Sequence, residues 1–411
     1  CTKMESSVNR FLGSSRFVKS SACKNLPQFD RNEVVLGKLL GSGGFSQAFE
    51  VKGFCPSEDV TGERSTDQED ARAKLLEKSR RKVKGTGQFV VKHIQSKFLD
   101  NPSRFKDAGV DIIIEAHFLA SIKHPNILGI EGLARGGVSA YSGGSHEAFF
   151  IIMERLHETL DQRIKRWDAQ LKRYRQPGLE KIAREGEMQQ LLFTGRLKVA
   201  RDVANAMAYL HSKGIIYRDT KPSNIGFDME GNVKIFDFGL SRELPEENPE
   251  MGDVFKMSGK VGTVRYMSNE CCKGEPYNQK SDVYSLSMVL WEMLALEKPF
   301  KTYTKSMHRE LVVEEAERPQ LDPSWPYGIQ ALLHCGWSPH ISVRPSMKDF
   351  HKVLVQEIME LQHTADGRRV TTSRALRRNV KSFALSVINK MDSQRSLNTA
   401  ETLVGLSGSL S

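Results

Sequence analysis

Two short polar stretches decide the fold of this chain: Tyr217–Asn224, which reads YRDTKPSN, and Asp237–Gly239, which reads DFG. The first sets an acid, Asp219, a cation, Lys221, and an amide oxygen, that of Asn224, on one short loop. The second places another acid after an apolar run. Transfer of a phosphoryl group to a hydroxyl needs such a set, because charge must be neutralised while the attacking oxygen is aimed.

The composition of the 411 residues, 39% hydrophobic and 27% charged, is typical of a soluble globular protein with room for two or three domains. No apolar run is long enough to span a membrane, and the polar start does not resemble a secretory signal. Because the first residue is Cys1, the chain can be a fragment. Six cysteines without metal-ligand spacing favour reduced thiols and an intracellular location, which we expect to be cytoplasmic, with the nucleus as the alternative.

Much of the net charge of +10 lies in two basic stretches, residues 78–84 and 368–381. Charge runs are usually solvated, so we interpret both stretches as surface segments and not as dedicated anion sites. We therefore expect no nucleic-acid partner.

A glycine-rich turn, Gly41–Ser46, lies between two apolar runs with the composition of strands, Val34–Leu40 and Phe45–Val51. Glycines let the backbone come close to phosphates and point its N–H groups at them. Taken alone, a plain β-hairpin turn is an equally good interpretation. The position between two strands, and not between a strand and a helix, argues against a dinucleotide-binding fold.

A lysine interrupts the next apolar run, Gln88–Ile94, which alternates as a strand does. Burial of the Lys92 ammonium costs several kcal/mol unless the charge is paired. Glu115, in the apolar helical run Asp111–Ala120, is the expected partner.

Taken in their order along the chain, the glycine-rich turn, Lys92, Glu115 and the two polar stretches resemble the motifs of the eukaryotic protein kinases, of the serine/threonine type. Within this family, the tyrosine-kinase-like group of serine/threonine kinases is favoured by two short stretches, Trp291–Met293 and Arg344–Ser346. The resemblance implies an α+β, two-lobed protein kinase fold. A small antiparallel β-sheet lobe with one helix is expected over residues 33–153, a hinge over 154–156, and a larger, mainly helical lobe over 157–362.

The same resemblance assigns chemical roles to the residues of the two stretches. Asp219 is expected to be the general base, and Lys221 to neutralise the γ-phosphate of ATP. Asn224 and Asp237 are expected to bind Mg²⁺, a hard ion that prefers oxygen ligands. Asp219, Lys221 and Asn224 form the expected catalytic set.

The nucleotide site is also implied by the resemblance. Lys92 would hold the α- and β-phosphates, and Glu115 would hold the lysine. Met153 would be the gatekeeper residue, and the backbone of Glu154 and Leu156 would bind the adenine edge. The full set expected to bind ATP is Leu40, Gly41, Ser42, Gly43, Gly44, Phe45, Ser46, Ala48, Lys92, Glu115, Met153, Glu154 and Leu156.

Regulation by phosphorylation is expected because Arg218 adjoins the catalytic aspartate, and a guanidinium can pair with a phosphate on a nearby loop. Ser258, flanked by Lys256 and Lys260, is the first candidate phosphate acceptor. Thr263 is expected to bond Asp219 and Lys221 instead.

Structural roles follow for five further residues. Asp282 is expected to anchor the backbone of the catalytic loop, Arg344 to pair with Glu270, and Tyr217 to pack beneath Phe238. The resemblance is imperfect where Gly226 replaces an apolar residue at the floor of the adenine pocket. We expect looser nucleotide binding there unless Phe227 fills the space.

The remaining segments carry weak patterns. We expect a flexible leader over residues 1–32, insertions near 53–86 and 160–190, and a flexible basic tail over 363–411. Residues 69–84 could form part of a helix, but their apolar positions are few, so disorder is the preferred interpretation for the first insertion.

Two other functions compete with an ATP-dependent protein kinase. A pseudokinase scaffold would keep the fold without the chemistry, but Lys92, Asp219, Asn224 and Asp237 are all retained. A small-molecule kinase of related fold is disfavoured by the complete segment from Asp237 to Glu270, whose end resembles a peptide-docking loop. The expected partners are protein substrates with serine or threonine and an upstream kinase.

Overall fold

The computed structural model describes residues 2–19, 21–56, 66–80, 87–174, 182–245, 253–259 and 261–365. The chain divides into two compact units. The first contains Cys1–Leu160 and Ser223–Glu243, and the second contains Asp161–Pro222 and Leu244–Ser411. This division differs from the expected lobes in one stretch, Ser223–Glu243, which is grouped with the N-terminal unit.

A six-stranded sheet forms the centre of the first unit, with the order β1-β5-β6-β4-β3-β2. Its neighbours are antiparallel except for β1 and β5, which run parallel. The expected strands are present, and β6 is buried along most of its length, as its unbroken apolar sequence requires. The strands are β1 (Gln28–Phe29), β2 (Val34–Ser42), β3 (Ser46–Phe54), β4 (Phe89–Ile94), β5 (Ile130–Ala134) and β6 (Phe150–Glu154).

Helix α3 (Pro102–Ser121) packs against this sheet and carries Glu115. The helix begins earlier than the apolar run alone indicates, because the Asn101 side chain accepts a hydrogen bond from the Arg104 N–H at 3.0 Å and a proline occupies the first turn. The apolar side chains of Ile112 and Ile113 are buried.

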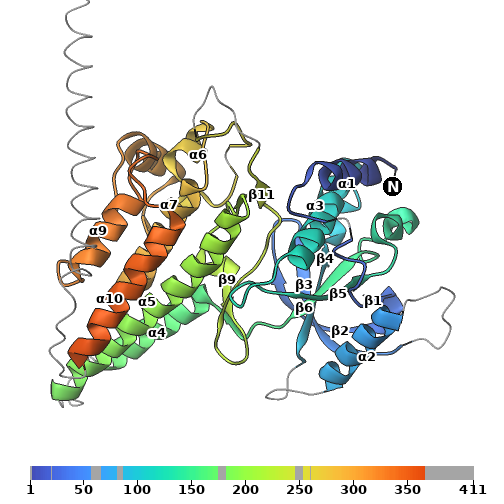
Figure 1. Ribbon diagram of the computed structural model, residues 1–411, viewed down its shortest axis with the longest axis horizontal. Helices are drawn as coiled ribbons and strands as arrows, with labels where there is room; N and C mark the ends of the chain where they lie inside the picture. The colour runs from blue at the N-terminus through green and yellow to red at the C-terminus, as the bar shows by residue number, and fades with distance from the viewer. Residues whose placement is uncertain are drawn as a thin grey trace, which may run out of the picture. The chain divides into compact units, whose positions relative to one another are not determined.

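The N-terminal segment is not a flexible leader. Residues Thr2–Ser14 form helix α1, which lies along α3 (Figure 1). Met4 and Val8 are buried, and the Phe11 ring lies 5.6 Å from that of Phe118. These three apolar residues recur at helical spacing, a short pattern that the polar composition around it obscures.

The first insertion likewise contains an ordered element. Helix α2 (Thr66–Arg80) replaces the expected disorder, while residues 57–65 and 81–86 lie outside the described part. Only Leu75 supplies a buried apolar side chain, but Arg72 is 5% exposed and forms an ion pair with Glu33. The Arg72 guanidinium also lies 4.2 Å from the centre of the Phe29 ring. The buried Arg72 guanidinium thus fixes α2 to the sheet, a role that an apolar helix face usually has.

A second, three-stranded sheet completes the first unit, in the order β10-β9-β7. The strands are β7 (Glu158–Thr159), β9 (Ile225–Phe227) and β10 (Val233–Ile235), and the short β11 (Arg242–Glu243) follows. Strands β9 and β10 are antiparallel, with Ile225 opposite Ile235.

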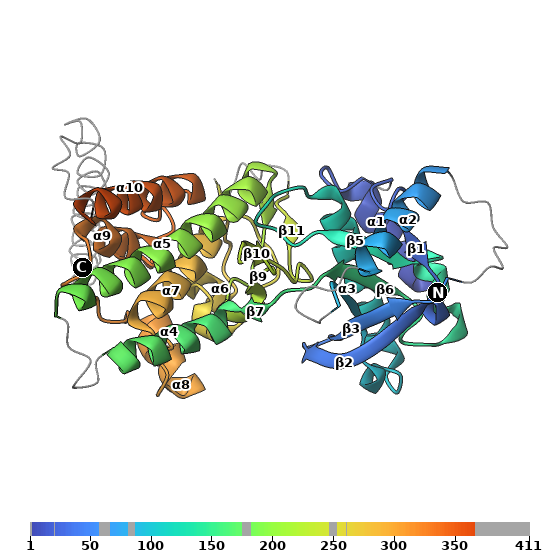
Figure 2. The ribbon, with the colours of Figure 1, turned by 90° about the horizontal axis from the view of Figure 1, so that it is seen from below.

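The second unit is mainly helical. Helix α7 is buried on nearly every side, as its apolar sequence predicts, and α5 and α9 pack against it. Helices α5 and α10 lie side by side (Figure 2). Its helices are α4 (Leu160–Tyr174), whose first residue belongs to the other unit, α5 (Ile182–Ser212), α6 (Asn269–Lys273), α7 (Lys280–Ala295), α8 (Lys305–Met307), α9 (Tyr327–Gly336) and α10 (Met347–Ala365).

The segment expected as a second insertion consists of α4 and the start of α5, with residues 175–181 outside the described part. Of the expected tail, residues 363–365 end α10 and residues 366–411 lie outside it as well. Among the helices that the structure describes, none combines the length and apolarity needed to cross a bilayer.

We predict that Glu292→Gln stabilises the protein at neutral and higher pH. The Glu292 carboxyl in α7 is buried and accepts a hydrogen bond from the Tyr266 hydroxyl at 2.7 Å, and burial raises its pKa from 4.5 to about 7. Between these values the folded state holds a proton that the unfolded chain releases, so stability falls as pH rises. The variant should flatten this slope and gain roughly 2 kcal/mol near pH 8.

Urea unfolding between about pH 5 and pH 8 measures the slope. The exposed Glu315→Gln serves as the control, because its carboxyl is not buried. An unchanged slope in Glu292→Gln would contradict the assignment.

Candidate active site

The Lys92 side chain joins three segments of the first unit. Lys92 lies in β4, opposite Ala48 of β3 and Ile151 of β6. Its Nζ atom donates to the two carboxylate oxygens of Glu115 at 2.8 and 2.7 Å, so the expected ion pair is present. The same atom lies 2.9 Å from Oδ1 of Asp237, a contact that the sequence did not predict.

The charges of this cluster are fixed by their proximity. Burial alone would lower the pKa of Lys92, but the carboxylates of Asp237 and Glu115 more than offset this effect and raise it above its ordinary value. The ammonium therefore stays charged at physiological pH. Glu115 also accepts a hydrogen bond from the Phe238 N–H at 3.3 Å, which ties α3 to the Asp237–Gly239 stretch.

Asn224 and Asp237 are brought together by the β9–β10 hairpin. Asn224 directly precedes β9 and Asp237 follows β10 closely, so antiparallel pairing places both at the same end of the hairpin. The Phe236 N–H donates to the Asn224 carbonyl at 3.1 Å. Asp237 adopts a left-handed conformation, with φ of 67°, and its side chain is 42% exposed. An open carboxylate beside a buried amide can accept a cation.

The glycine-rich turn connects β2 to β3, as expected. The Gly43 N–H donates to the Ser46 carbonyl at 2.8 Å, and the Gln95 side chain donates to the same carbonyl at 3.2 Å. Phe45 at its tip is half exposed, and its ring stacks on Phe98 at 5.6 Å. The turn is thus held at its base by Gln95.

In the second unit, Asp219 is buried between a cation and a hydroxyl. Lys221 Nζ donates to Asp219 Oδ2 at 2.6 Å, and Thr263 Oγ1 donates to Oδ1 at 3.2 Å. The bond from Thr263 to Asp219 was expected. Gly262 makes it possible: its φ is 110°, and a Cβ there would lie 2.7 Å from the Arg218 carbonyl.

The backbone before Asp219 is held by a buried carboxylate, as predicted. Asp282 of α7 accepts hydrogen bonds from the N–H groups of Tyr217 at 2.9 Å and Arg218 at 2.8 Å. His211 Nε2 lies 2.9 Å from the same carboxylate, a contact the sequence did not reveal. These bonds hold Arg218 in a left-handed conformation, with φ of 70°. Tyr217 and Phe238 are both buried, in different units, so their expected packing stays a prediction.

The two expected regulatory residues are neighbours. Arg218 Nη1 donates to Ser258 Oγ at 2.8 Å and contacts the Tyr277 hydroxyl at 3.2 Å. The Tyr277 hydroxyl in turn donates to the Ser258 carbonyl at 2.9 Å. Tyr277 was missed, because nothing in its local sequence marks it.

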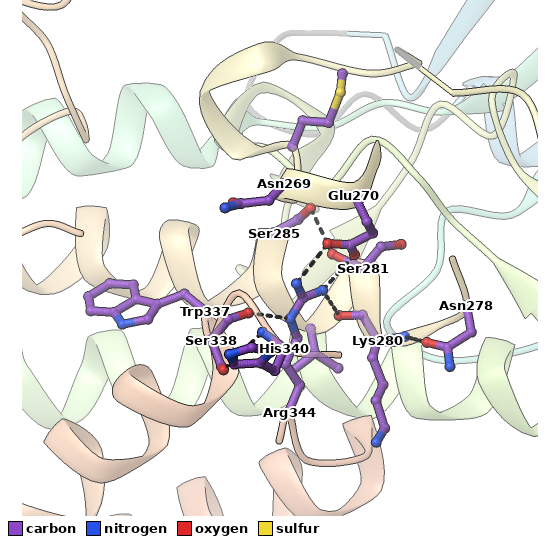
Figure 3. A network of polar contacts seen from close by, with 12 residues as sticks. Asn269, Glu270, Asn278, Lys280, Ser281, Ser285, Trp337, Ser338, His340 and Arg344 are labelled. Carbon is purple, nitrogen blue, oxygen red and sulfur yellow. Dashed lines mark hydrogen bonds and ion pairs between the residues drawn. The ribbon is translucent and has the colours of Figure 1, made fainter. Parts of the chain in front are cut away.

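Glu270 and Arg344 form the expected buried pair with two parallel hydrogen bonds, of 2.7 and 2.8 Å (Figure 3). Arg344 also donates to the carbonyls of Ser338 at 2.8 Å and Lys280 at 3.3 Å. Burial alone would raise the pKa of Glu270, but the Arg344 guanidinium outweighs it and the pKa is lowered. The end of the loop is thereby fixed to the helical unit.

The space beside Gly226 is filled from the hinge. A Cβ on Gly226 would lie 2.6 Å from Leu156 Cδ1 and 3.3 Å from the Phe236 ring. Phe227, the other residue expected to fill this space, is buried in β9, and its role there stays a prediction. Met153, at the end of β6, is also buried.

We predict that Gly226→Ala lowers the free energy of unfolding by about 1 kcal/mol, because the new methyl group meets Leu156. In a Leu156→Ala background the loss should shrink, since the close contact is gone. Urea unfolding of the four variants gives the coupling energy. Gly129→Ala, where a Cβ meets nothing within 4 Å, is the control. Strict additivity would refute the contact.

Comparison with known proteins agrees with this geometry. The chain is 34% identical over 203 residues to the serine/threonine/tyrosine-protein kinase HT1 of Arabidopsis thaliana, a match that covers 48% of this chain and 50% of that protein. It is 34% identical to the Arabidopsis serine/threonine-protein kinase STY17, over 40% of this chain and 28% of that protein.

A probable LIM domain-containing serine/threonine-protein kinase of Dictyostelium discoideum is 32% identical, over 46% of this chain and 18% of that protein. The matches thus span at most about half of these relatives. The protein kinase domain family matches residues 79–396, most of the chain. The chain belongs to the protein kinase domain family.

Proposed function

We propose that this chain is an active, ATP- and Mg²⁺-dependent serine/threonine protein kinase. The observation that carries the proposal is the pair of contacts from Lys92 to Glu115 and Asp237, at 2.7 to 2.9 Å. A lysine held between these two acids is oriented to meet the phosphates of a nucleotide. The names of the similar proteins point to the same activity.

The residues present fit a hard divalent cation. Asn224 offers an amide oxygen and Asp237 a half-exposed carboxylate at one end of a hairpin, and oxygen ligands of this kind suit Mg²⁺. When bound, the ion would neutralise charge on the phosphates. Lys92 adds a fixed positive charge from the same unit.

Asp219 is the proposed proton acceptor. As the substrate hydroxyl oxygen bonds to the γ-phosphorus, the bond to the oxygen shared with ADP breaks, and the hydroxyl proton passes to Asp219. Its carboxylate is oriented by Thr263 and Lys221, and Lys221 provides the cation that offsets negative charge on the transferred group.

A pseudokinase scaffold is expected to have lost one or more of the charged residues that bind the nucleotide and the metal ion. Here Lys92 forms hydrogen bonds with both Glu115 and Asp237. A small-molecule substrate is disfavoured because the segment from Asp237 to Glu270 is complete and its end, which resembles a peptide-docking loop, is held by the pair of Glu270 with Arg344. Since one relative is named as a serine/threonine/tyrosine kinase, peptides with tyrosine belong in the assay. The cytoplasm is the proposed compartment, with the nucleus as the alternative, and imaging of a tagged chain tests it.

We predict that Asp219→Asn lowers kcat about a thousandfold, because the proton acceptor is lost while the shape is kept. Transfer from labelled ATP to a peptide library measures it, and binding of an ATP analogue should change little. Asp202→Asn, on α5 of the same unit, is the matched control. Equal transfer by wild type and Asp219→Asn would falsify the assignment of the base, whereas no transfer by either would favour the scaffold.

We also propose that Ser258 accepts a regulatory phosphate from an upstream kinase. The Arg218 guanidinium already contacts the Ser258 hydroxyl at 2.8 Å, so a phosphate there would gain a charge-assisted partner and order the loop beside Asp219.

Phosphatase treatment of the phosphorylated wild type should then lower activity by about tenfold. Ser258→Ala should show the lower activity from the start, and Arg218→Met should carry the phosphate without the gain. Ser306→Ala, on the exposed α8, is the control. Full activity of Ser258→Ala would rule the site out.

A further inference from the structure

The N-terminal segment packs closely on the helix that carries Glu115. Met4 and Val8 of α1 are buried, and Phe11 contacts Phe118 of α3. The fit is close at Gly109, where a Cβ would lie 2.6 Å from Met4 Cε. Helix α1 therefore occupies a surface of α3 that a larger residue at Gly109 would block.

Directly after α1, the chain binds the Glu243 carboxylate of β11. Ser15 Oγ donates to Glu243 Oε1, and the Arg16 N–H donates to Oε2 at 2.8 Å. The Phe17 N–H contacts the same carboxylate at 3.3 Å. Ser15 Oγ also accepts from the Val18 N–H at 2.7 Å, so one hydroxyl organises the whole turn.

Helix α1, helix α3 and strand β11 each contact the other two, either directly or through the turn that follows α1. Residue Arg242, next to Glu243, lies 3.8 Å from Asp111 of α3, and α3 is packed against α1. The segment of residues 2–18, which we call the N-terminal latch, thus touches both α3 and the strand that follows Asp237–Gly239 in sequence. Helix α3 carries Glu115, and β11 ends the short segment that begins at Asp237, so both partners of Lys92 are close in sequence or structure to elements that the latch contacts.

We propose that Ser15 is a phosphorylation site that opens the N-terminal latch and lowers activity. The inference rests on the proposed kinase function for its activity readout. A phosphate on Ser15 would carry nearly two negative charges beside the Glu243 carboxylate, and Ser15 would lose the proton it donates. Repulsion would expel the turn, and α3 would lose a support on its outer face.

The covalent step is an ordinary phosphoryl transfer. The Ser15 oxygen bonds to the γ-phosphorus of ATP, ADP departs, and the hydroxyl proton goes to the catalytic base of the kinase that acts on it. The flanking Ser14 and Arg16 are exposed, so the turn lies at the surface and can be presented after local opening. The phosphate then prevents the turn from closing again.

Four versions of the 411-residue chain test the latch: wild type, Ser15→Glu, Ser14→Glu as the matched control, and the double variant Ser15→Glu with Glu243→Gln. Amide hydrogen exchange across α3 reports the latch independently of activity. Ser15→Glu should speed exchange in α3 and lower kcat/KM by about tenfold. Ser14→Glu should change neither, because within the part of the chain that the structure describes the Ser14 hydroxyl donates only to the Phe11 carbonyl of its own helix. The double variant should recover both readouts, since the charge repulsion is removed.

Unchanged exchange in Ser15→Glu, or no recovery in the double variant, would overturn the proposal. The two proposals can fail separately. If Ser15→Glu speeds exchange in α3 but the wild type transfers no phosphate, the latch is supported and the proposed kinase function is contradicted. Mass spectrometry of wild type and Asp219→Asn from eukaryotic cells tests the modification. Phosphate on Ser15 in both supports a separate kinase, phosphate in wild type alone supports self-modification, and phosphate in neither overturns the site.

Discussion

The first unit depends on one buried ammonium group. Lys92 lies in the middle of a sheet, where an unpaired charge would cost several kcal/mol, and two carboxylates offset that cost. Glu115 comes from α3 and Asp237 from the turn after β10. The sheet, the helix and the hairpin must therefore all be correctly placed for Lys92 to reach both carboxylates. The electrostatic requirement of one side chain therefore sets the arrangement of three elements.

The second unit solves a similar problem with buried carboxylates. Asp282 satisfies two backbone N–H groups beside Asp219, and Glu270 satisfies the Arg344 guanidinium. Asp282 lies in α7, which is buried on nearly every side, and Glu270 lies in α6. A rigid helix thus supports a loop whose own backbone adopts an uncommon conformation at Arg218.

Sequence reasoning predicted the parts of the fold that depend on strong local patterns. The strands around Lys92 follow from alternating apolar residues, and the pairing of Lys92 with Glu115 from the cost of a buried charge. The pairing of Arg344 and the anchoring by Asp282 were implied by the resemblance to protein kinases. Helices α1 and α2 were missed, because few apolar residues mark them and a buried arginine anchors α2. Contacts between distant segments, such as Ser15 with Glu243 or Leu156 beside Gly226, leave no periodic signal.

Under the proposed ATP-dependent activity, the close contact between Gly226 and Leu156 bears on the selectivity of small-molecule inhibitors. A Cβ atom on a strand residue at position 226 would be fixed by the backbone. The Leu156 side chain, which lies beside Gly226 here, can instead move by rotating about its side-chain torsions. An inhibitor with an aliphatic substituent could displace Leu156 and occupy the volume beside the glycine. Proteins with a bulky residue at the equivalent position would lack that room, so the pair offers a basis for selective chemistry.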